Sequence, residues 1–162
     1  MTTSTHETQI IADSDVPLVR IVREFDASPE KVFQAHIDPA LFAQWTGPNG
    51  YEVRIDHFDG RTGGSFRYVV AGDGFEGGFR GCFHEVRPAE LIVQTFTFEG
   101  VPDGVALERL MFEDLGNGRT RLTSTSLVDS FEGRDAFVAS GMEVGVREGY
   151  ERLDDLLSAN RG

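Results

Sequence analysis

The segment from Tyr51 to Val128 constrains the fold most, because it reads as six strands in succession joined by short turns. The turns are built from Gly, Pro, Asp and Asn, and the pair Asn117-Gly118 is a strong hairpin signal. Turns this short can join only antiparallel neighbours, so the segment predicts an antiparallel meander. Its predicted strands are Tyr51–Phe58, Ser65–Ala71, Gly77–Arg87, Leu91–Phe98, Ala106–Leu115 and Thr120–Val128.

A further strand and two short helices are predicted before the meander. Residues 17–25 read as the first strand. Ser28 and Pro29 are typical of a helix N-cap and first helical position, and this helix should end before Asp38, which precedes a proline. A second helix is predicted from Pro39 to Trp45, where a Gly-Pro-Asn-Gly run stops it.

The last thirty residues read as one long amphipathic helix with glycine at every fourth position, at Gly141, Gly145 and Gly149. Each glycine disfavours a helix interior by roughly 1 kcal/mol relative to alanine. The glycines border the apolar stripe, so part of the buried side of the helix is bare backbone. Two interpretations stay open. The helix leaves room for a ligand over the sheet, or it packs closely against neighbouring backbone or breaks into two.

Together these elements predict a single α+β domain spanning residues 17–160. A strongly curved, seven-stranded antiparallel sheet is expected to be covered on one face by the long C-terminal helix, with two short helices between strands 1 and 2. Residues 1–16 lack a sustained apolar period and are predicted to form a mobile tail.

The charge balance argues against a nucleic-acid partner. The chain has 15 Lys and Arg against 27 Asp and Glu, a formal net charge of −12, and its cations are scattered among carboxylates. It has neither a basic start followed by an apolar run nor a stretch of 18 apolar residues. We therefore expect a cytoplasmic protein that does not insert into a membrane.

The chain carries no common catalytic or metal-binding signature. Cys82 is the single cysteine, and its apolar neighbours suggest a buried, inert thiol. The four histidines lack ligand spacing, so neither a metal site nor a cofactor is expected. Residues 72–77 match G-x-G-x-x-G, but a strand follows them where a dinucleotide site needs a helix, so a hairpin turn is predicted. The catalytic residues, if there are any, stay unknown.

The order of the short motifs resembles the SRPBCC or START-like superfamily, and within it the bacterial branch named after the activator of heat-shock-protein ATPase. The resemblance covers about residues 17–158. It is carried by residues 28–33 (SPEKVF), 45–48 (WTGP), 63–67 (GGSFR), 81–88 (GCFHEVRP), 118–122 (GRTRL) and the C-terminal run that holds the glycines. The resemblance implies a helix-grip fold, in which a curved sheet grips the C-terminal helix around a hydrophobic pocket. Pockets of this kind accept lipids, polyketides and other apolar molecules.

The leading functional hypothesis is therefore the binding of a hydrophobic small molecule between the sheet and the C-terminal helix. Polar orienting groups could come from Glu148 and from Glu108 or Arg109, of which only one can face inward. A buried Glu108 or Arg109 would need a partner. The predicted lining comprises Trp45, Phe66, Phe79, Phe83, Phe96, Glu108, Met111, Val138, Met142, Gly145 and Val146.

Two alternatives stay open. One is a cofactor-free cyclase or hydrolase acting on a polyketide or aromatic substrate, in which an inward His or carboxylate transfers protons. The other is a stress-related or chaperone-linked interaction module, with homodimerisation through an exposed strand or the glycine-rich helix face. The absence of catalytic signatures favours a binding protein over an enzyme.

Overall fold

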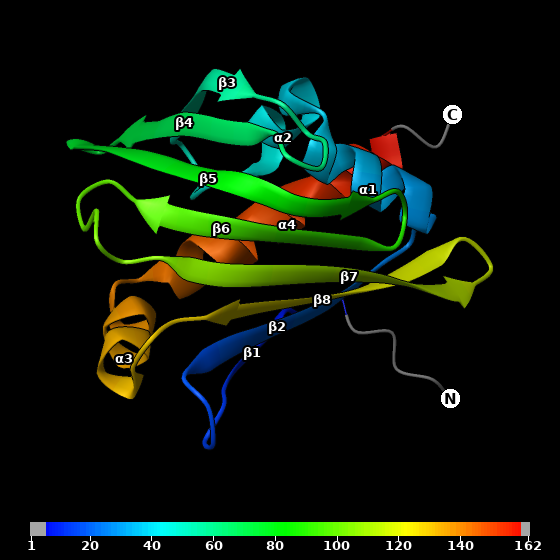
Figure 1. Ribbon diagram of the computed structural model, residues 1–162. Coiled ribbons are helices and arrows are strands. Elements are labelled where there is room, and N and C mark those ends of the chain that lie inside the picture. Colours follow the sequence, from blue (N-terminus) through cyan, green and yellow to red (C-terminus); the bar gives the residue numbers. More distant parts are fainter. Residues whose placement is uncertain (1–5, 160–162) are drawn as a thin grey trace.

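The computed structural model describes residues 6–159 and shows an eight-stranded antiparallel sheet wrapped around the C-terminal helix (Figure 1). The strand order is β1-β2-β8-β7-β6-β5-β4-β3, so the meander predicted from residue 51 onward is confirmed. The elements are β1 (Gln9–Ala12), β2 (Leu18–Phe25), α1 (Pro29–Ile37), α2 (Pro39–Trp45), β3 (Glu52–Phe58), β4 (Ser65–Gly72), β5 (Phe75–Arg87), β6 (Leu91–Phe98), β7 (Ala106–Gly116), β8 (Arg119–Leu127), α3 (Phe131–Ala139) and α4 (Met142–Ala159).

The sheet has one strand more than predicted, because β1 lies in the segment expected to be a mobile tail. Gln9–Ala12 pair with β2, with Gln9 opposite Val22 and Ala12 opposite Val19. Backbone hydrogen bonds to the edge of β2 hold this strand, and such bonds leave little pattern in the side chains. The prediction of a mobile tail is therefore wrong for residues 9–12. Residues 1–5 of that tail and residue 160 of the predicted domain lie outside the described residues.

The two short helices begin where the sequence places them. The Ser28 side chain accepts a hydrogen bond from the Lys31 amide at 3.4 Å, and Pro29 occupies the first turn of α1. The Asp38 carboxylate accepts one from the Ala40 amide at 2.9 Å and caps α2. Both caps satisfy amides that have no partner inside the helix.

The predicted single C-terminal helix is two helices. The chain turns at Gly141, whose φ of +89° lies in the left-handed region that residues with a Cβ rarely adopt. α3 ends just before this turn and α4 begins directly after it. The expectation of one continuous helix is therefore wrong, and the alternative of a broken helix is correct.

The packed core occupies one end of the concave face of the sheet, where α1, α2 and the C-terminal half of α4 cover it (Figure 1). Phe25, Val32 and Leu153 are completely covered there. Trp45 donates its indole N–H to the Ala35 carbonyl at 2.9 Å and stacks against Tyr150, with ring centroids 5.9 Å apart. α4 thus rests on the sheet mainly through its second half.

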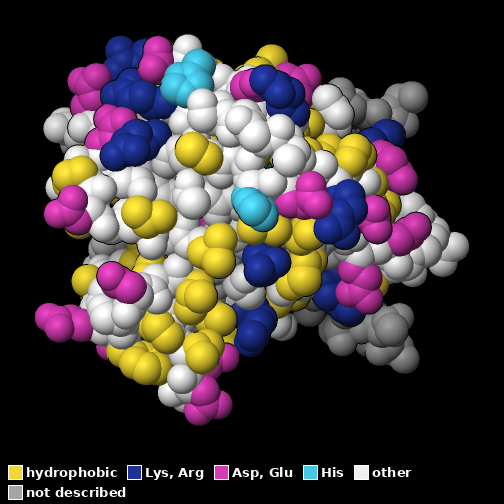
Figure 2. Space-filling view, viewed as in Figure 1, with side chains coloured by type: hydrophobic (Ala, Val, Ile, Leu, Met, Phe, Trp, Pro, Cys, Tyr) yellow, Lys and Arg dark blue, Asp and Glu magenta, His cyan; other side chains and the backbone are white. Residues whose placement is uncertain are grey.

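The convex face of the sheet carries exposed side chains, including the thiol predicted to be buried. Cys82 is exposed, because β5 points its neighbour Phe83 into the core and Cys82 to the opposite side. Figure 2 shows hydrophobic side chains gathered on this face over β7, β8 and α3. Leu107 and Leu127 lie opposite each other there, and both are exposed.

The glycine-rich motif between β4 and β5 is a hairpin turn, as predicted. Asp73 and Gly74 have φ values of +51° and +78°, as residues of a tight hairpin do. Gly72 opposite Phe75 closes the ladder, and a strand follows directly.

Candidate functional site

Strand β7 turns Glu108 toward the concave face of the sheet and Arg109 toward solvent. The neighbours Ala106 and Leu110 on the Glu108 side are buried, whereas Arg109 is exposed. Register places Glu108 between Gln94 of β6 and Ser126 of β8. A carboxylate therefore lies on the face of the sheet that also carries the core.

Glu108 is bound by two uncharged donors. Gln94 Nε2 donates to Oε1 at 2.9 Å, and Ser126 Oγ donates to Oε2 at 2.6 Å. Within residues 6–159, no arginine or lysine forms an ion pair with this carboxylate. Burial raises the pKa of the Glu108 carboxyl, and the bonds from Ser126 and Gln94 offset this only in part. An inward-facing Glu108 is expected to need a partner, and the half-buried carboxylate has an uncharged hydrogen-bond donor on each side.

Two tyrosine hydroxyls face the same region. Tyr68 of β4 and Tyr150 of α4 are both buried, and burial together with the charge of Glu108 raises the pKa of each. Both hydroxyls therefore stay protonated at neutral pH. Neither has a hydrogen-bond partner among residues 6–159. Each hydroxyl is thus free to donate or to accept a hydrogen bond.

An aromatic wall adjoins these polar groups, and it is only half-covered. Phe79 stacks against Tyr68 and Phe96, with ring centroids 5.5 Å apart in both pairs. Phe79 and Phe96 are half-buried. So are Val138 of α3 and the α4 residues Met142 and Val146, which cover this end of the concave face. These five predicted lining residues are therefore half-buried, as Glu108 is.

Three other predicted lining residues belong to the packed core. Trp45, Phe66 and Phe83 are buried. Phe66 and Phe83 contact each other, with ring centroids 5.3 Å apart. They lie toward the end covered by α1 and α2, and apolar side chains fill the space around them.

Two predicted lining residues point elsewhere. Met111 is 41% exposed, because it alternates with the buried Leu110 and Phe112 and so lies on the convex face of the sheet. Gly145 faces Pro48, since a Cβ built on Gly145 would lie 3.6 Å from the proline ring. A Cβ on Gly149 would lie 3.0 Å from the Trp45 carbonyl oxygen. The prediction that Met111 and Gly145 line the pocket is therefore wrong.

The glycines of α4 belong to a tight contact with the loop after α2. Arg152 Nη2 donates to the Trp45 carbonyl at 2.9 Å and also contacts the Gly47 carbonyl. Glu148 accepts a hydrogen bond from the Asn49 amide at 2.9 Å, so this predicted orienting group holds the loop instead. The interpretation of the glycines as close packing against backbone is correct.

Sequence reasoning did not place Tyr68, Tyr150, Gln94 and Ser126 at this site. The alternation of side chains along a strand could have identified two of them, because Tyr68 shares a face with Phe66 and Gln94 shares one with Phe96. Tyr150 follows Gly149 on the buried side of α4. Ser126 could be found only from the register between β7 and β8.

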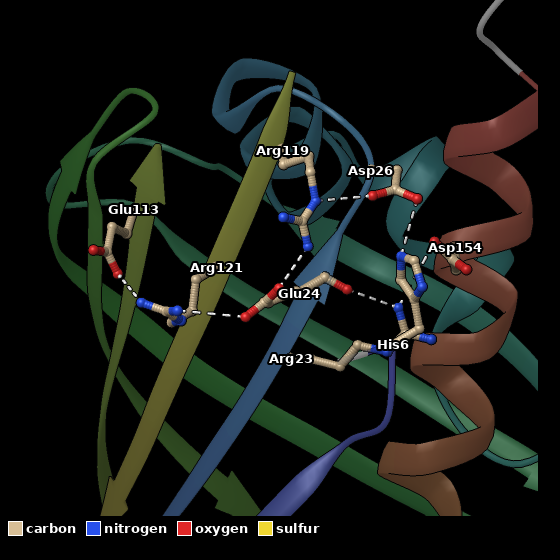
Figure 3. A network of polar contacts seen from close by, with 8 residues as sticks. All are labelled: His6, Arg23, Glu24, Asp26, Glu113, Arg119, Arg121 and Asp154. Carbon is tan, nitrogen blue, oxygen red and sulfur yellow. Dashed lines mark hydrogen bonds and ion pairs between the residues drawn. The ribbon is translucent and has the colours of Figure 1, made fainter. Parts of the chain in front are cut away.

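A second polar cluster lies at the C-terminal end of β2, around Glu24 and Asp26 (Figure 3). It is a network of ion pairs. Glu24 contacts Arg119 at 2.6 Å and Arg121 at 3.4 Å, and Arg119 also contacts Asp26 at 3.1 Å. Burial opposes ionisation of Glu24, but its bonds to the two arginines outweigh that effect and lower its pKa. In this network the cations and carboxylates satisfy one another.

Two surface hollows lie apart from Glu108. One, of about 500 Å³, adjoins the network at the start of α1 and includes Asp26, Lys31 and Arg119. The other, of about 140 Å³, lies between α1, α2 and α4 near Leu41 and Leu157. Neither is lined by Glu108 or by the aromatic wall beside it.

No helix within residues 6–159 is long and apolar enough to cross a membrane. Over the same range, no three His, Cys, Asp or Glu side chains gather in a geometry that could hold a metal ion.

The chain is similar in sequence and structure to known proteins. The family model described as "Activator of Hsp90 ATPase homolog 1-like protein" matches residues 26–158. A comparison with curated proteins found no significant match.

Solved structures share the fold over nearly the whole chain. A protein from Rhodobacter sphaeroides is 28% identical, with a TM-score of 0.82, over 96% of this chain and 100% of that one. A protein from Arthrobacter aurescens is 27% identical, with a TM-score of 0.85, over 99% of this chain and 95% of that one. A protein from Mycobacterium smegmatis has a TM-score of 0.86 and is 22% identical over 96% of this chain and 100% of that one. At this identity the likeness supports the fold alone.

Proposed function

The chain belongs to the activator of Hsp90 ATPase homolog 1-like family, and from this premise we propose that it binds a hydrophobic small molecule of the lipid, polyketide or aromatic type. The family is known for ligand binding. The proposed site is the half-covered end of the concave face, between the sheet, α3 and the N-terminal half of α4. The lining would be Tyr68, Phe79, Phe96, Glu108, Val138, Met142, Val146 and Tyr150.

One observation carries this proposal: the apolar side chains at this end of the concave face are incompletely covered. Phe79, Phe96 and Val146 are half-buried, whereas inward residues at the other end, such as Phe25 and Leu153, are fully buried. Apolar surface left partly open on a concave face is available to an apolar ligand. Covering it would add to the affinity by roughly 25 cal/mol for each Å² removed from water.

A pair of substitutions on α4 tests the site. Val146→Trp fills the half-covered region, whereas Val144→Trp places the same side chain at a position that is 56% exposed. The neutral dye Nile red, whose emission rises in apolar surroundings, reports binding. We expect Val146→Trp to weaken dye binding at least tenfold and Val144→Trp to leave it unchanged. The proposed site would be contradicted if the wild type and both variants bound the dye equally well. It would also be contradicted if none of the three proteins bound it.

A cyclase or hydrolase is the second candidate function, and Glu108 is the observation that favours it. A carboxyl whose pKa is raised by burial, close to two protonated tyrosines, is a candidate acid or base. Hydrolysis of p-nitrophenyl esters of aromatic acids would measure such activity. Release of p-nitrophenol by the wild type that Glu108→Gln abolishes would support an enzyme. Equal release by both would count against it.

The homodimer and the chaperone-linked role stay predictions. The exposed apolar side chains over β7, β8 and α3 are a surface on which either contact could form (Figure 2). Light scattering coupled to size-exclusion chromatography would measure the oligomeric state. A monomer at micromolar concentration would contradict the predicted homodimer.

A further inference from the structure

Glu108 has hydrogen-bonding capacity that the protein leaves unused. Each carboxylate oxygen receives one donor from the protein, Gln94 at 2.9 Å or Ser126 at 2.6 Å. An ionised carboxylate offers about four lone-pair sites, so each oxygen can accept a further hydrogen bond. The hydroxyls of Tyr68 and Tyr150 are unpartnered within residues 6–159 and face the same region. The polar end of the proposed site is thus a strong acceptor flanked by two adaptable hydroxyls.

Within residues 6–159 no cation forms an ion pair with Glu108, although the charge of Arg23 acts on Tyr150. Arg23 is the buried cation beneath α4, and its exposed fraction is 3%. Its Nη1 donates to the Glu24 carbonyl at 3.0 Å and lies 3.7 Å from Asp154, which balances its charge, while its Nε has no partner among residues 6–159. Arg109, next to Glu108 in sequence, is on the opposite face of the sheet. A negatively charged ligand at Glu108 would meet the half-buried carboxylate at a position where no cation pairs with it, which is unfavourable.

We propose that this site selects apolar ligands that present an uncharged hydrogen-bond donor, such as a hydroxyl, to Glu108, and that it rejects anions such as fatty-acid carboxylates. The inference rests on the proposed binding of a hydrophobic molecule at this site. The aromatic wall of Phe79 and Phe96 would hold the body of the ligand, and Glu108 would accept its donor. Glu108 thereby becomes the residue that determines specificity.

Three probes with the same aromatic body test this selectivity. They are 2-naphthol, which carries a donor, 2-methoxynaphthalene, which lacks one, and 2-naphthoate, which is an anion. Their affinities are measured at pH 7 by displacement of Nile red from the full chain. We expect 2-naphthol to bind about tenfold more tightly than 2-methoxynaphthalene, the usual size of one hydrogen bond to a charged group, and 2-naphthoate to bind most weakly.

Two variants assign the selectivity to Glu108. Glu108→Gln keeps the shape and removes the charge, so we expect 2-naphthol to lose most of its advantage and 2-naphthoate to bind about tenfold more tightly than to the wild type. This gain in binding would not follow from damage to the fold. Arg109→Gln changes the neighbouring charge on the outer face and should leave all three affinities unchanged, and circular dichroism checks that both variants fold.

The outcomes separate this inference from the proposed function. Dye binding that Val146→Trp abolishes, combined with an unchanged order of the three probes in Glu108→Gln, would overturn the selectivity and leave the binding site intact. Wild-type protein that binds 2-naphthoate as tightly as 2-naphthol would do the same. If Nile red and all three probes fail to bind, the proposed function falls and the inference falls with it.

Discussion

Two glycines of α4 that look equivalent in the sequence differ in what surrounds them. A Cβ on Gly145 would make ordinary van der Waals contact with Pro48 at 3.6 Å, whereas one on Gly149 would lie 3.0 Å from the Trp45 carbonyl oxygen. Alanine favours a helix by roughly 1 kcal/mol relative to glycine. The same substitution should therefore have opposite effects at the two positions.

We predict that Gly145→Ala raises the free energy of unfolding by up to about 1 kcal/mol. Gly149→Ala should lower it, because the backbone at Trp45 would have to move. Urea denaturation of both variants beside the wild type measures the difference. A gain in stability for Gly149→Ala would show that the loop after α2 yields easily and that the close contact is unimportant.

His36 is a titratable group enclosed in the core. Its ring lies 4.8 Å from the Trp45 ring and 5.4 Å from the Phe112 ring, measured between centroids. Nδ1 lies 2.7 Å from the Val32 carbonyl, and Nε2 has no partner in the part of the chain that the structure describes. Burial lowers the pKa of His36 from 6.5 to about 4, in spite of the bond to Val32.

This shift makes the protein sensitive to acid. Because the folded pKa is lower than the unfolded one, the stabilisation is complete above pH 6.5 and is lost as the pH falls toward 4, by roughly 3 kcal/mol in total. We predict that His36→Phe flattens the dependence of unfolding free energy on pH between 6.5 and 5, measured by urea denaturation. Slopes of equal size in the two proteins would contradict a neutral, buried His36.

At the scale of the elements, Arg134 joins α3 to the two strands at the edge of the sheet. Its Nη1 donates to the Asp13 carbonyl at 2.7 Å and to the Leu18 carbonyl at 2.9 Å. Its side chain is 9% exposed. Removing it would leave both carbonyls without this donor. One arginine of α3 thus fixes the turn between β1 and β2.

We predict that Arg134→Ala lowers the free energy of unfolding by about 2 kcal/mol and speeds amide hydrogen exchange in Gln9–Ala12. Asp135→Ala is the matched control, because its ion pair with Arg134 is on the surface and Asp135 is 70% exposed. That variant should cost less than about 1 kcal/mol. Unchanged exchange in β1 after Arg134→Ala would show that backbone pairing alone holds the strand.

At the scale of the whole molecule, Glu108 lowers the stability of the fold at neutral pH. Its folded pKa is raised above the unfolded value, so its contribution to stability is present below about pH 4.5 and is lost as the pH rises. We predict that Glu108→Gln unfolds at higher urea concentration than the wild type at pH 7. The difference should shrink as the pH approaches 4.5.

A Glu108 that stabilised the folded state would give the opposite change in unfolding free energy. If Glu108 stabilised the fold through Gln94 and Ser126, Glu108→Gln would be less stable than the wild type at pH 7. Ser126→Ala distinguishes the two cases further, because it removes one donor to the carboxylate and should raise the pKa of Glu108. Nuclear magnetic resonance of the Glu108 side-chain carboxyl carbon would measure that shift.

Local signals in the sequence determined most of the elements. Turn residues and strand runs predicted the meander. Ser28 and Pro29 predicted the start of the first short helix and Asp38 before Pro39 its end, and the structure confirms both short helices. Turn residues and helix caps depend on only a few neighbouring residues, so they can be identified from a single sequence. β1 escaped the prediction because its partner is the edge of β2 and its own pattern is weak.

The sequence by itself determined the order of the elements from β2 to β8, the antiparallel meander and the likeness to a helix-grip fold. Only the tertiary structure decided that Glu108 faces inward while Met111 faces outward, because the side of a strand that is buried depends on what covers it. Likewise, the spacing of the glycines required something close to α4, and only the packed molecule shows that this is the backbone at Trp45 rather than an open site. Spacing along a chain fixes which residues share a face, whereas the partner of that face is set by contacts between residues far apart in sequence.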